Sequence, residues 1–466
     1  MDRRNHCRTA VFFLLCTLCA AFMVYPAWIQ TAMGFCSVSA ESEQEYLYQD
    51  AIYYKITAQK EVTITRSRAS VKEAVIPEEL GGYPVTAIQS YAFRNRTQLK
   101  RVVLPNTVRE IGDYAFYQCA KLTDVEVPDS VEQVGWGILK ETPWLEQNEQ
   151  EFVTVGNHIL IGYHGTGGAV VVPDTVTALA GYAFADCATV TDVVLPDHLK
   201  EIPAFAFDHC TALRHVTLPA QLEKIGEYAF HWCSNLEQIA IPDQVTAVGH
   251  HAFFKCSKLQ QVQLPEGLTR LENAVFAGCQ VLSAIQLPNS LERIGNQAFY
   301  ECAALQEIQL PKTVSYVGKS AFCNCTALQK IVIENPDCQI FDEDLTIFQE
   351  AVIYGRLDSY AKSYAQRYDR LFVPLDAVQL GDVDGNGSIE LTDATLALTE
   401  YAQQAVLADS ILTTDQMLRA DVNQNERIDL ADATLILTYY AEHAVGNDVT
   451  FEMLQKNEGN VFSKGV

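Results

Sequence analysis

Basic residues are scarce in this 466-residue sequence, in which 33 lysines and arginines face 58 aspartates and glutamates for a formal net charge of −25. A surface with this excess of negative charge repels phosphate backbones and anionic lipid. We therefore expect no nucleic-acid partner and no binding to a membrane surface. An acidic surface is instead typical of an extracellular protein and of one that binds divalent cations.

The sequence also lacks the short motifs that mark common active sites. It contains no glycine-rich phosphate loop and no strand-borne Gly-x-Ser-x-Gly motif. Its one Cys-x-x-Cys pair, Cys16 and Cys19, lies in a leader segment. These absences predict a protein that is not an enzyme.

The leader has the pattern of an export signal. Three arginines lie in the first eight residues, an uncharged apolar run covers residues 10–24, and the small residues Val38, Ser39 and Ala40 precede Glu41. This order predicts a signal peptide over residues 1–40, a secreted mature chain, and no membrane insertion after cleavage. Since the apolar run is short for a spanning helix, an uncleaved anchor is the less favoured alternative.

Cysteines recur with a fixed spacing rather than in the pattern of a disulfide framework. Seven of them are 23 residues apart without a slip: Cys187, Cys210, Cys233, Cys256, Cys279, Cys302 and Cys325. Cys119 fits the same pattern. A period of this size indicates a solenoid, in which each unit is one coil of a stack.

The residues between the cysteines predict how one coil is built. After Cys256 the apolar positions Leu259, Val262 and Leu264 end in alternation, as expected for a half-buried strand, and Pro265 ends the strand. A glycine later in most coils is expected to turn the chain back. One such coil cannot bury its apolar side chains alone, so we expect stacked coils with ladders of Leu, Val, Phe and Cys.

These units, with their Leu-Pro, Ile-Gly and Ala-Phe-x-x-Cys signatures, resemble the BspA-like leucine-rich repeats of bacterial surface proteins. The resemblance covers roughly residues 45–375 in about nine coils. It implies a β-rich solenoid over residues 41–375, with 76–86 as the opening coil and a cap around a helix in residues 341–375. Residues 138–172 depart from the period; Phe152 to Tyr163 alternates like a strand, and we interpret the segment as one enlarged coil.

The periodic cysteines have two interpretations. Buried thiols pack like small hydrophobic side chains, which their place beside the phenylalanine ladder favours. Disulfides between neighbouring coils require strained geometry in a regular stack. A disulfide among Cys323, Cys325 and Cys338 near the cap stays open.

Amide side chains flank the inward residue of successive strands and are expected to point outward on one face. They are Gln238, Gln261, Gln263, Gln286 and Gln309. Amides donate and accept hydrogen bonds without charge, which suits a glycan or a protein ligand. The alternative is a solvated sheet face without a ligand. The ten histidines fall at unrelated coil positions, and the adjacent pair His250 and His251 indicates no metal or catalytic role.

After Leu380 the pattern changes to two acidic loops, each followed by a helix. The first has the spacing of a twelve-residue calcium loop, with side-chain oxygens from Asp382, Asp384, Asn386 and Asp393, a turn at Gly387 and the carbonyl of Ser388. The second lies 39 residues further on and offers Asp421, Asn423, Asn425, Asp432 and the carbonyl of Arg427. The helices that follow match over residues 394–402 and 433–441.

The pair of units resembles a type I dockerin over about residues 380–443. The resemblance implies a small all-α module over 380–445, two Ca²⁺ ions and a cohesin domain of a scaffold protein as partner. Glu426 stands where the family has its turn glycine, so we expect a weaker second site. Partner choice in dockerins lies at loop positions 10 and 11, which here are Leu391, Thr392, Leu430 and Ala431. For Leu398 and Leu437 on these helices, packing between the helices is an alternative equal to a role in docking. Residues 446–466 are expected to form a C-terminal tail.

Together these features predict a non-catalytic, secreted recognition or adhesion protein held on a cell-surface, cellulosome-like scaffold by calcium-dependent cohesin binding. The alternatives are a component or regulator of polysaccharide degradation and a protein-binding inhibitor. A glycosidase needs two carboxylates roughly 5–10 Å apart across a cleft. The enlarged coil at 138–172 is the one place where such a cleft is expected.

Overall fold

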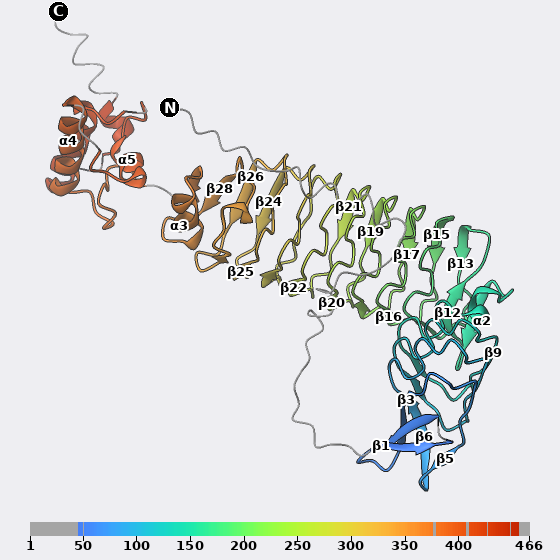
Figure 1. Ribbon diagram of the computed structural model, residues 1–466. Coiled ribbons are helices and arrows are strands. Elements are labelled where there is room, and N and C mark those ends of the chain that lie inside the picture. The colour runs from blue at the N-terminus through green and yellow to red at the C-terminus, as the bar shows by residue number, and fades with distance from the viewer. Residues whose placement is uncertain are drawn as a thin grey trace, which may run out of the picture. The chain divides into compact units, whose positions relative to one another are not determined.

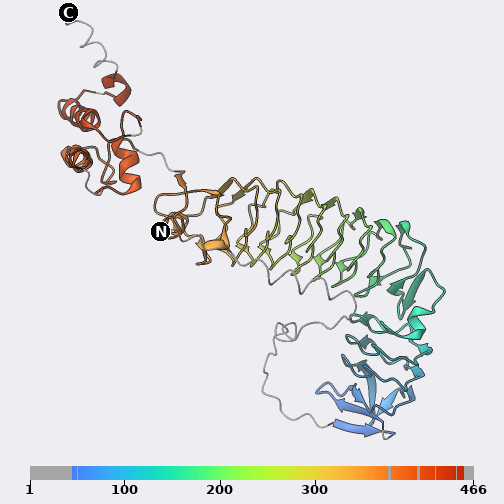
Figure 2. The same cartoon turned by 45° about the horizontal axis from the view of Figure 1, so that its top comes forward.

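The computed structural model describes residues 45–49, 51–375, 379–406, 410–425, 427–447 and 449–455. The expected signal peptide and its cleavage site lie outside these residues, as does Glu426. Figures 1 and 2 show coils stacked side by side through the green, yellow and orange part of the chain, and a separate group of helices in red. The predicted solenoid is therefore confirmed.

Most coils contribute one short strand to each of two series. The first series contains β2 (Ile52–Ile56), β3 (Val62–Ser67), β6 (Tyr83–Ile88), β8 (Glu110–Ile111), β10 (Gln133–Val134), β14 (Ala178–Leu179), β16 (Glu201–Ile202), β18 (Lys224–Ile225), β20 (Ala247–Val248), β22 (Arg270–Leu271), β23 (Arg293–Ile294), β25 (Tyr316–Val317) and β27 (Gln339–Ile340). The second contains β4 (Glu73–Val75), β7 (Arg101–Val103), β9 (Asp124–Glu126), β13 (Gly168–Val171), β15 (Val190–Val194), β17 (His215–Thr217), β19 (Gln238–Ala240), β21 (Gln261–Gln263), β24 (Glu307–Leu310), β26 (Lys330–Ile333), β28 (Val352–Gly355) and β29 (Phe372–Pro374). From β3 and β4 onward, the members of each series that pair do so in parallel, for example Gln238 with Gln261, one repeat apart.

Before β7, two strands stand outside this alternation. They are β1 (Glu45–Tyr48) and β5 (Glu79–Leu80), and β5 pairs antiparallel with β6. Ahead of the opening coil expected at 76–86, β2 and β3 are also antiparallel. The solenoid thus begins earlier than expected, with a hairpin whose second strand pairs in parallel with β6.

Stacked phenylalanines form the centre of the solenoid. The rings of Phe207 and Phe230 are parallel within 2° and have centroids 5.1 Å apart, and both side chains are fully buried. The same stacking continues through Phe253, Phe276, Phe299 and Phe322. A 23-residue period therefore stacks the side chains at equivalent positions of successive coils. This stacking lets each coil bury its apolar face against the next.

The recurring glycines are explained by close approach between coils rather than by a turn. A Cβ atom on Gly226 would lie 2.5 Å from the backbone nitrogen of Ala204 in the preceding coil, and the φ angle of Gly226 is not positive. The tight turns use other residues, since Tyr228 and Trp232 have φ angles of 56° and 58°. The expectation that these glycines bend the chain is thus wrong.

The enlarged coil contains a hairpin where a single strand was expected. Its elements are α2 (Pro143–Glu146), β11 (Phe152–Val155) and β12 (Ile159–Tyr163). The strands β11 and β12 pair antiparallel. Gly156 and His158, with φ angles of 56° and 55°, form the turn between them. Alternation alone does not reveal this turn, because the apolar pattern continues on both sides of it.

A second departure is a break in the second series. Residues 284–286 form no strand, although their sequence repeats the pattern of β21 and β24. The last coil is covered as expected by a helix, α3 (Tyr360–Arg367), which Ser359 caps and which buries Ala361, Tyr364 and Ala365. A short 3₁₀ helix, η1 (Asp344–Thr346), precedes it.

The described residues of the C-terminal module form more helix than the two helices expected. They include α4 (Leu391–Ala405), α5 (Thr414–Ala420) and α6 (Leu430–Ala444), and residues 451–455 are helical as well. Its core is small and includes Val383, Ala397, Leu435 and Ile436. Phe451 and Leu454, from the segment expected to be a tail, also pack in this core. Within the described ranges, no helix has the length and apolar character needed to cross a bilayer.

Candidate functional site

The first acidic loop brings three carboxylates together at the start of α4. One oxygen atom from each of Asp382, Asp384 and Asp393 lies within 4.8 Å of the others. Asp393 is fully buried, and its two oxygens accept hydrogen bonds from the backbone nitrogens of Asp384 (3.0 Å) and Glu390 (2.9 Å). The last carboxylate of the loop is therefore fixed in place by the first turn of the helix.

The two oxygens of the Asp382 carboxylate differ in their partners. Its Oδ2 accepts hydrogen bonds from the Gly387 backbone nitrogen at 3.1 Å and from Arg419 Nη1 at 3.3 Å. Its Oδ1 is buried and accepts no hydrogen bond from any described residue. An unsatisfied buried acceptor is costly, and carboxylate oxygens are the donors that Ca²⁺ prefers. The donor set of this loop therefore fits calcium.

The other expected ligands of the first loop lie on its exposed rim. Asn386 and Ser388 are exposed, and the backbone nitrogen of Ser388 donates to Asn386 Oδ1 at 2.8 Å. Gly385 and Gly387 have φ angles of 77° and 90°, which glycine adopts without the clash that a side chain causes. The sharp turn expected at Gly387 is thus present.

The second loop repeats this arrangement around Asp432. This buried carboxylate accepts hydrogen bonds from the backbone nitrogens of Asn423 (3.2 Å) and Asp429 (3.0 Å). Burial raises the pKa of Asp432, Asp421 and Asp429 nearby raise it further, and the two backbone N–H groups oppose the rise. A carboxyl group destabilised in its charged form gains from a cation beside it.

The two loops differ in the ligands they offer and at one turn residue. In the second loop Asn423 replaces the carboxylate of Asp384, while Asn425 holds the place of Asn386 and donates from its backbone nitrogen to Asp421 Oδ1 at 3.0 Å. Its left-handed residue is Gln424, with a φ angle of 59°, where the first loop has Gly385. Arg427 is exposed, and its backbone nitrogen donates to Asn425 Oδ1 at 2.9 Å. The expectation for Glu426 lies outside the described residues.

The helices that follow the loops present matching exposed side chains. The exposed fractions are 56% for Leu391, 46% for Leu398, 54% for Leu430 and 45% for Leu437. Thr392 and Ala431 are exposed as well. The buried core of the module, which does not include Leu398 or Leu437, instead contains Ala394 and Ala397 of α4 and Leu435 and Ile436 of α6. Packing between the helices therefore does not account for Leu398 and Leu437.

Within the solenoid, the expected amide face lies along a hollow. All five glutamines of this face, Gln238, Gln261, Gln263, Gln286 and Gln309, are exposed. Gln261, Gln286 and Gln309 line a hollow of about 1240 Å³ that extends over the strand break at 284–286. Gln238 and Gln263 are not among its lining residues. The structure thus divides the predicted face into residues at the hollow and residues beside it.

A small hollow of about 150 Å³ lies at the enlarged coil. Asp186 is its one carboxylate, and its Oδ2 lies 3.6 Å from Lys140 Nζ. A glycosidase site needs two carboxylates that face each other. The lining of this hollow does not supply such a pair.

One residue that contacts the first loop, Arg419, could not be predicted from the loop spacing. Arg419 lies on α5 and its guanidinium is mostly buried against Asp382. The backbone nitrogen of Gly381 also donates to the Arg419 carbonyl at 2.8 Å. The only signal in the sequence is a lone basic residue just before the second loop, which does not show that it reaches the first.

Comparison with known families assigns both parts of the chain. The model of the BspA type leucine rich repeat region matches six copies, over residues 52–150, 168–281 and 223–349. The model of the dockerin type I domain matches residues 380–439. Both families are non-catalytic protein-interaction modules, as the sequence predicted. A search of curated proteins found no match.

Several solved structures of bacterial leucine-rich repeat proteins resemble this chain. A leucine rich cell surface protein from Faecalibacterium prausnitzii is 23% identical, with 72% of this chain and 96% of that protein aligned and a TM-score of 0.38. A leucine-rich repeat protein from Bacteroides ovatus is 22% identical, with 71% and 100% aligned and a TM-score of 0.35. The pneumococcal vaccine antigen PcpA is 14% identical, with 72% and 100% aligned and a TM-score of 0.41. With the repeat model covering more than half of its length, the chain belongs to the BspA-type leucine-rich repeat family, and it carries a C-terminal type I dockerin domain.

Proposed function

We propose that this protein is an extracellular adaptor whose dockerin attaches it to a cohesin-bearing, cellulosome-like scaffold while its repeats bind a separate ligand. Dockerin type I domains bind calcium and have cohesin domains as partners. The observation that carries the proposal is the buried Asp382 Oδ1 without a hydrogen-bond donor, beside Asp384 and Asp393. This arrangement supports a cation in the first loop.

In this proposal each loop holds one Ca²⁺. The first ion is bound by Asp382, Asp384, Asn386 and Asp393 and by the carbonyl of Ser388, and the second by the corresponding groups Asp421, Asn423, Asn425, Asp432 and the carbonyl of Arg427. Asp393 and Asp432 lie in the first turns of α4 and α6. Calcium binding therefore closes each loop and fixes the first turn of the helix that follows it. The exposed leucines lie on these helices.

The second site is the weaker one in this proposal. It has two carboxylates at direct ligand positions where the first has three, because Asn423 replaces Asp384. Affinity in such loops depends on the charge and rigidity of the ligands. The left-handed Gln424 adds strain where the first loop has a glycine.

The docking surface consists of Leu391, Thr392 and Leu398 on one helix and Leu430, Ala431 and Leu437 on the other. Exposed leucines at equivalent places on two helices are unusual for a small soluble module, and exposed apolar groups commonly mark a protein interface. Because the two units repeat the same pattern, we propose that either helix can make the main contact with a cohesin.

For the repeats we propose an uncharged polar ligand at the hollow along Gln261, Gln286 and Gln309. Amide groups suit sugar hydroxyls and peptide groups equally, so glycan and protein ligands are both compatible with this face. A role in adhesion or substrate recognition follows, with participation in polysaccharide degradation or inhibition of a partner protein as the alternatives. Secretion through cleavage of residues 1–40 is part of the same proposal.

A binding experiment on the full secreted chain tests the adaptor function. The chain is passed over immobilised cohesins of several types in calcium, and again in chelator. We expect retention in calcium by at least one cohesin and release by chelator, with the Asp393→Ala variant not retained. Retention that is equal with and without calcium would contradict the proposal. A glycan array with the same chain then identifies the ligand class of the repeats.

A further inference from the structure

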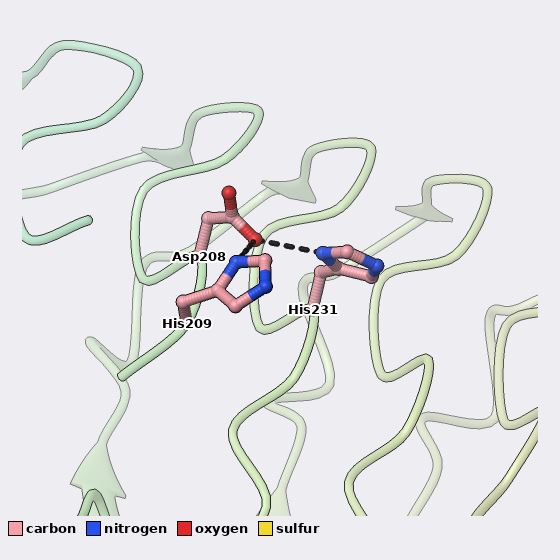
Figure 3. A group of neighbouring side chains, drawn as sticks. All are labelled: Asp208, His209 and His231. Atoms are coloured by element: carbon pink, nitrogen blue, oxygen red, sulfur yellow. Dashed lines mark hydrogen bonds and ion pairs between the residues drawn. The ribbon is translucent and has the colours of Figure 1, made fainter. Parts of the chain in front are cut away.

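Two histidines and an aspartate meet on the solenoid at a place where the sequence showed no relation among the histidines. Asp208 and His231 occupy the same position of consecutive coils, two residues before Cys210 and Cys233, and His209 is adjacent to Asp208 (Figure 3). Residues one period apart lie side by side in a stack. His209 and His231 occupy different coil positions, as the sequence indicated, and they meet because both reach Asp208.

A single oxygen atom joins the three side chains. Asp208 Oδ1 lies 2.8 Å from Nδ1 of His209 and 2.7 Å from Nδ1 of His231. The exposed side-chain fractions are 8% for Asp208, 19% for His231 and 43% for His209. The carboxylate is therefore buried, whereas the two imidazoles reach solvent to different extents.

A carboxylate is out of place in this part of the repeat. The equivalent positions of other coils hold uncharged side chains, namely Tyr117, Ala185, Phe254, Ala277, Tyr300 and Cys323. Burying a carboxylate in place of an apolar group destabilises a fold unless a partner compensates the charge. Two neutral imidazoles that donate hydrogen bonds compensate it in part, and a bound cation compensates it more completely.

Neighbouring aromatic rings hold both imidazoles in position. The ring of His231 stacks on Phe254 with centroids 5.3 Å apart and meets the edge of Tyr228 at the same distance. The ring of His209 is parallel to that of Trp232 within 5°, with centroids 5.9 Å apart. Ligands whose rings are already packed lose little conformational freedom when they bind an ion.

We propose that Asp208 Oδ1 and the Nδ1 atoms of His209 and His231 bind one divalent transition-metal ion of the Zn²⁺ class. With bonds of about 2.1 Å, neighbouring ligands are about 3.0 Å apart around an octahedral ion and about 3.4 Å apart around a tetrahedral one. The two distances from Asp208 Oδ1 to the Nδ1 atoms therefore need to open by about 0.2 to 0.7 Å. Each neutral imidazole then carries its proton on Nε2. The remaining coordination positions face solvent and take water or an oxygen atom of a bound molecule.

The chemistry of this site differs from that of the acidic loops. Two imidazole nitrogens and one carboxylate suit Zn²⁺, Co²⁺ or Ni²⁺, whereas Ca²⁺ prefers oxygen ligands alone. The site is therefore expected to stay free of calcium at concentrations that fill the dockerin loops. This difference allows the two kinds of site to be measured separately in one chain.

Metal titration of the full chain, without a histidine tag and with millimolar calcium present throughout, tests the proposal. We expect one Zn²⁺ per chain by calorimetry, and weak visible absorption bands of nitrogen- and oxygen-bound Co²⁺ that Zn²⁺ displaces. His231→Gln and the more exposed His209→Gln should each weaken Zn²⁺ binding about tenfold or more. His158→Gln, which changes an exposed histidine elsewhere on the solenoid, is the matched control and should leave binding unchanged.

Three results would overturn the proposal. They are no Zn²⁺ binding to the unaltered chain, binding by the His209→Gln and His231→Gln variants that equals binding by the unaltered chain, and a strong near-ultraviolet band of thiolate-bound Co²⁺. Asp208→Asn adds a separate check, because it keeps the size of the side chain and removes the charge. Circular dichroism without metal confirms that each variant is folded, so that a loss of binding reports on the ligands.

Discussion

The thiol of Cys256 donates a hydrogen bond to the carbonyl oxygen of Phe230, 3.1 Å away and one coil earlier. The same bond, between 2.9 and 3.4 Å, joins Cys119, Cys210, Cys233, Cys279, Cys302 and Cys325 to the phenylalanine 26 residues before each of them. The ladder cysteines thus fill space and also donate a second hydrogen bond to a carbonyl that already accepts one from the backbone, as Phe230 does from the Cys233 nitrogen at 3.2 Å. A small hydrophobic residue such as alanine supplies only the first of these roles.

The first prediction is that these thiols do not react in the folded protein. All ten cysteines that the structure describes are free, and burial raises the pKa of Cys119 to about 11 and that of Cys325 to about 12. Because the thiolate is the reactive form, iodoacetamide at pH 8 should label these residues only after unfolding. Mass mapping of native and urea-treated samples measures this. Reductant should leave the melting temperature unchanged, and disulfides between adjacent ladder cysteines would contradict the prediction.

The second prediction is that calcium folds the dockerin and that its first loop contributes more than its second. Without the ion the clustered carboxylates repel one another and the core is small, so binding energy becomes folding energy. Chelator should remove the signal of α4 to α6 in circular dichroism while the solenoid stays folded. Asp393→Ala should reduce calcium affinity and helix content more than Asp432→Ala. Equal losses in calorimetry of the two variants would show that the loops are equivalent.

The third prediction concerns the left-handed turn of the second loop. Gln424 has a φ angle of 59°, which costs a residue with a side chain about 1 kcal/mol relative to glycine. Gln424→Gly should therefore tighten calcium binding by the second loop severalfold. Gly385→Ala, at the equivalent place in the first loop with a φ angle of 77°, is the reciprocal variant and should weaken binding there. Calorimetry in which neither affinity changes would exclude strain as the cause.

The fourth prediction separates the amide residues at the hollow from those beside it. The triple variant Gln261→Ala, Gln286→Ala and Gln309→Ala should fold normally, since exposed substitutions of this kind usually change stability by less than about 0.5 kcal/mol. It should bind the ligand found on the glycan array or by pull-down less well. The control is Gln238→Ala with Gln263→Ala, which changes the same face outside the hollow. A larger loss in the control would place the ligand elsewhere.

The fifth prediction is that the two leucine-bearing helices dock interchangeably. Leu391→Asp with Leu398→Asp leaves α6 intact, and Leu430→Asp with Leu437→Asp leaves α4 intact, so each pair should retain cohesin binding with a few-fold loss. All four substitutions together should abolish it, because charge replaces the exposed apolar surface of both helices. Surface plasmon resonance at fixed calcium measures this. Complete loss with one pair alone would show a single docking face.

Much of this architecture could be predicted from the sequence because it repeats. A constant 23-residue spacing forces Cys256 and Cys279 into equivalent places, and alternation around Val262 specifies which neighbours point outward. The loop spacing from Asp382 to Asp393 similarly identifies the oxygen donors, since position along a twelve-residue loop dictates which groups converge. Periodicity and loop length are local properties of the chain, and they determined the solenoid, the dockerin and the candidate calcium ligands.

The remaining features were decided only in three dimensions. The hairpin at Gly156, the strand break at 284–286 and the hollow over it depend on backbone conformations that the apolar pattern does not distinguish. The exposure of Leu398 depends on how α4 meets α6, because either face of the helix could have packed inward. Asp208 and His231 meet because stacking converts a separation of one period into direct contact between side chains. Local sequence specifies each coil, whereas the distance and orientation of side chains on neighbouring coils are set by packing.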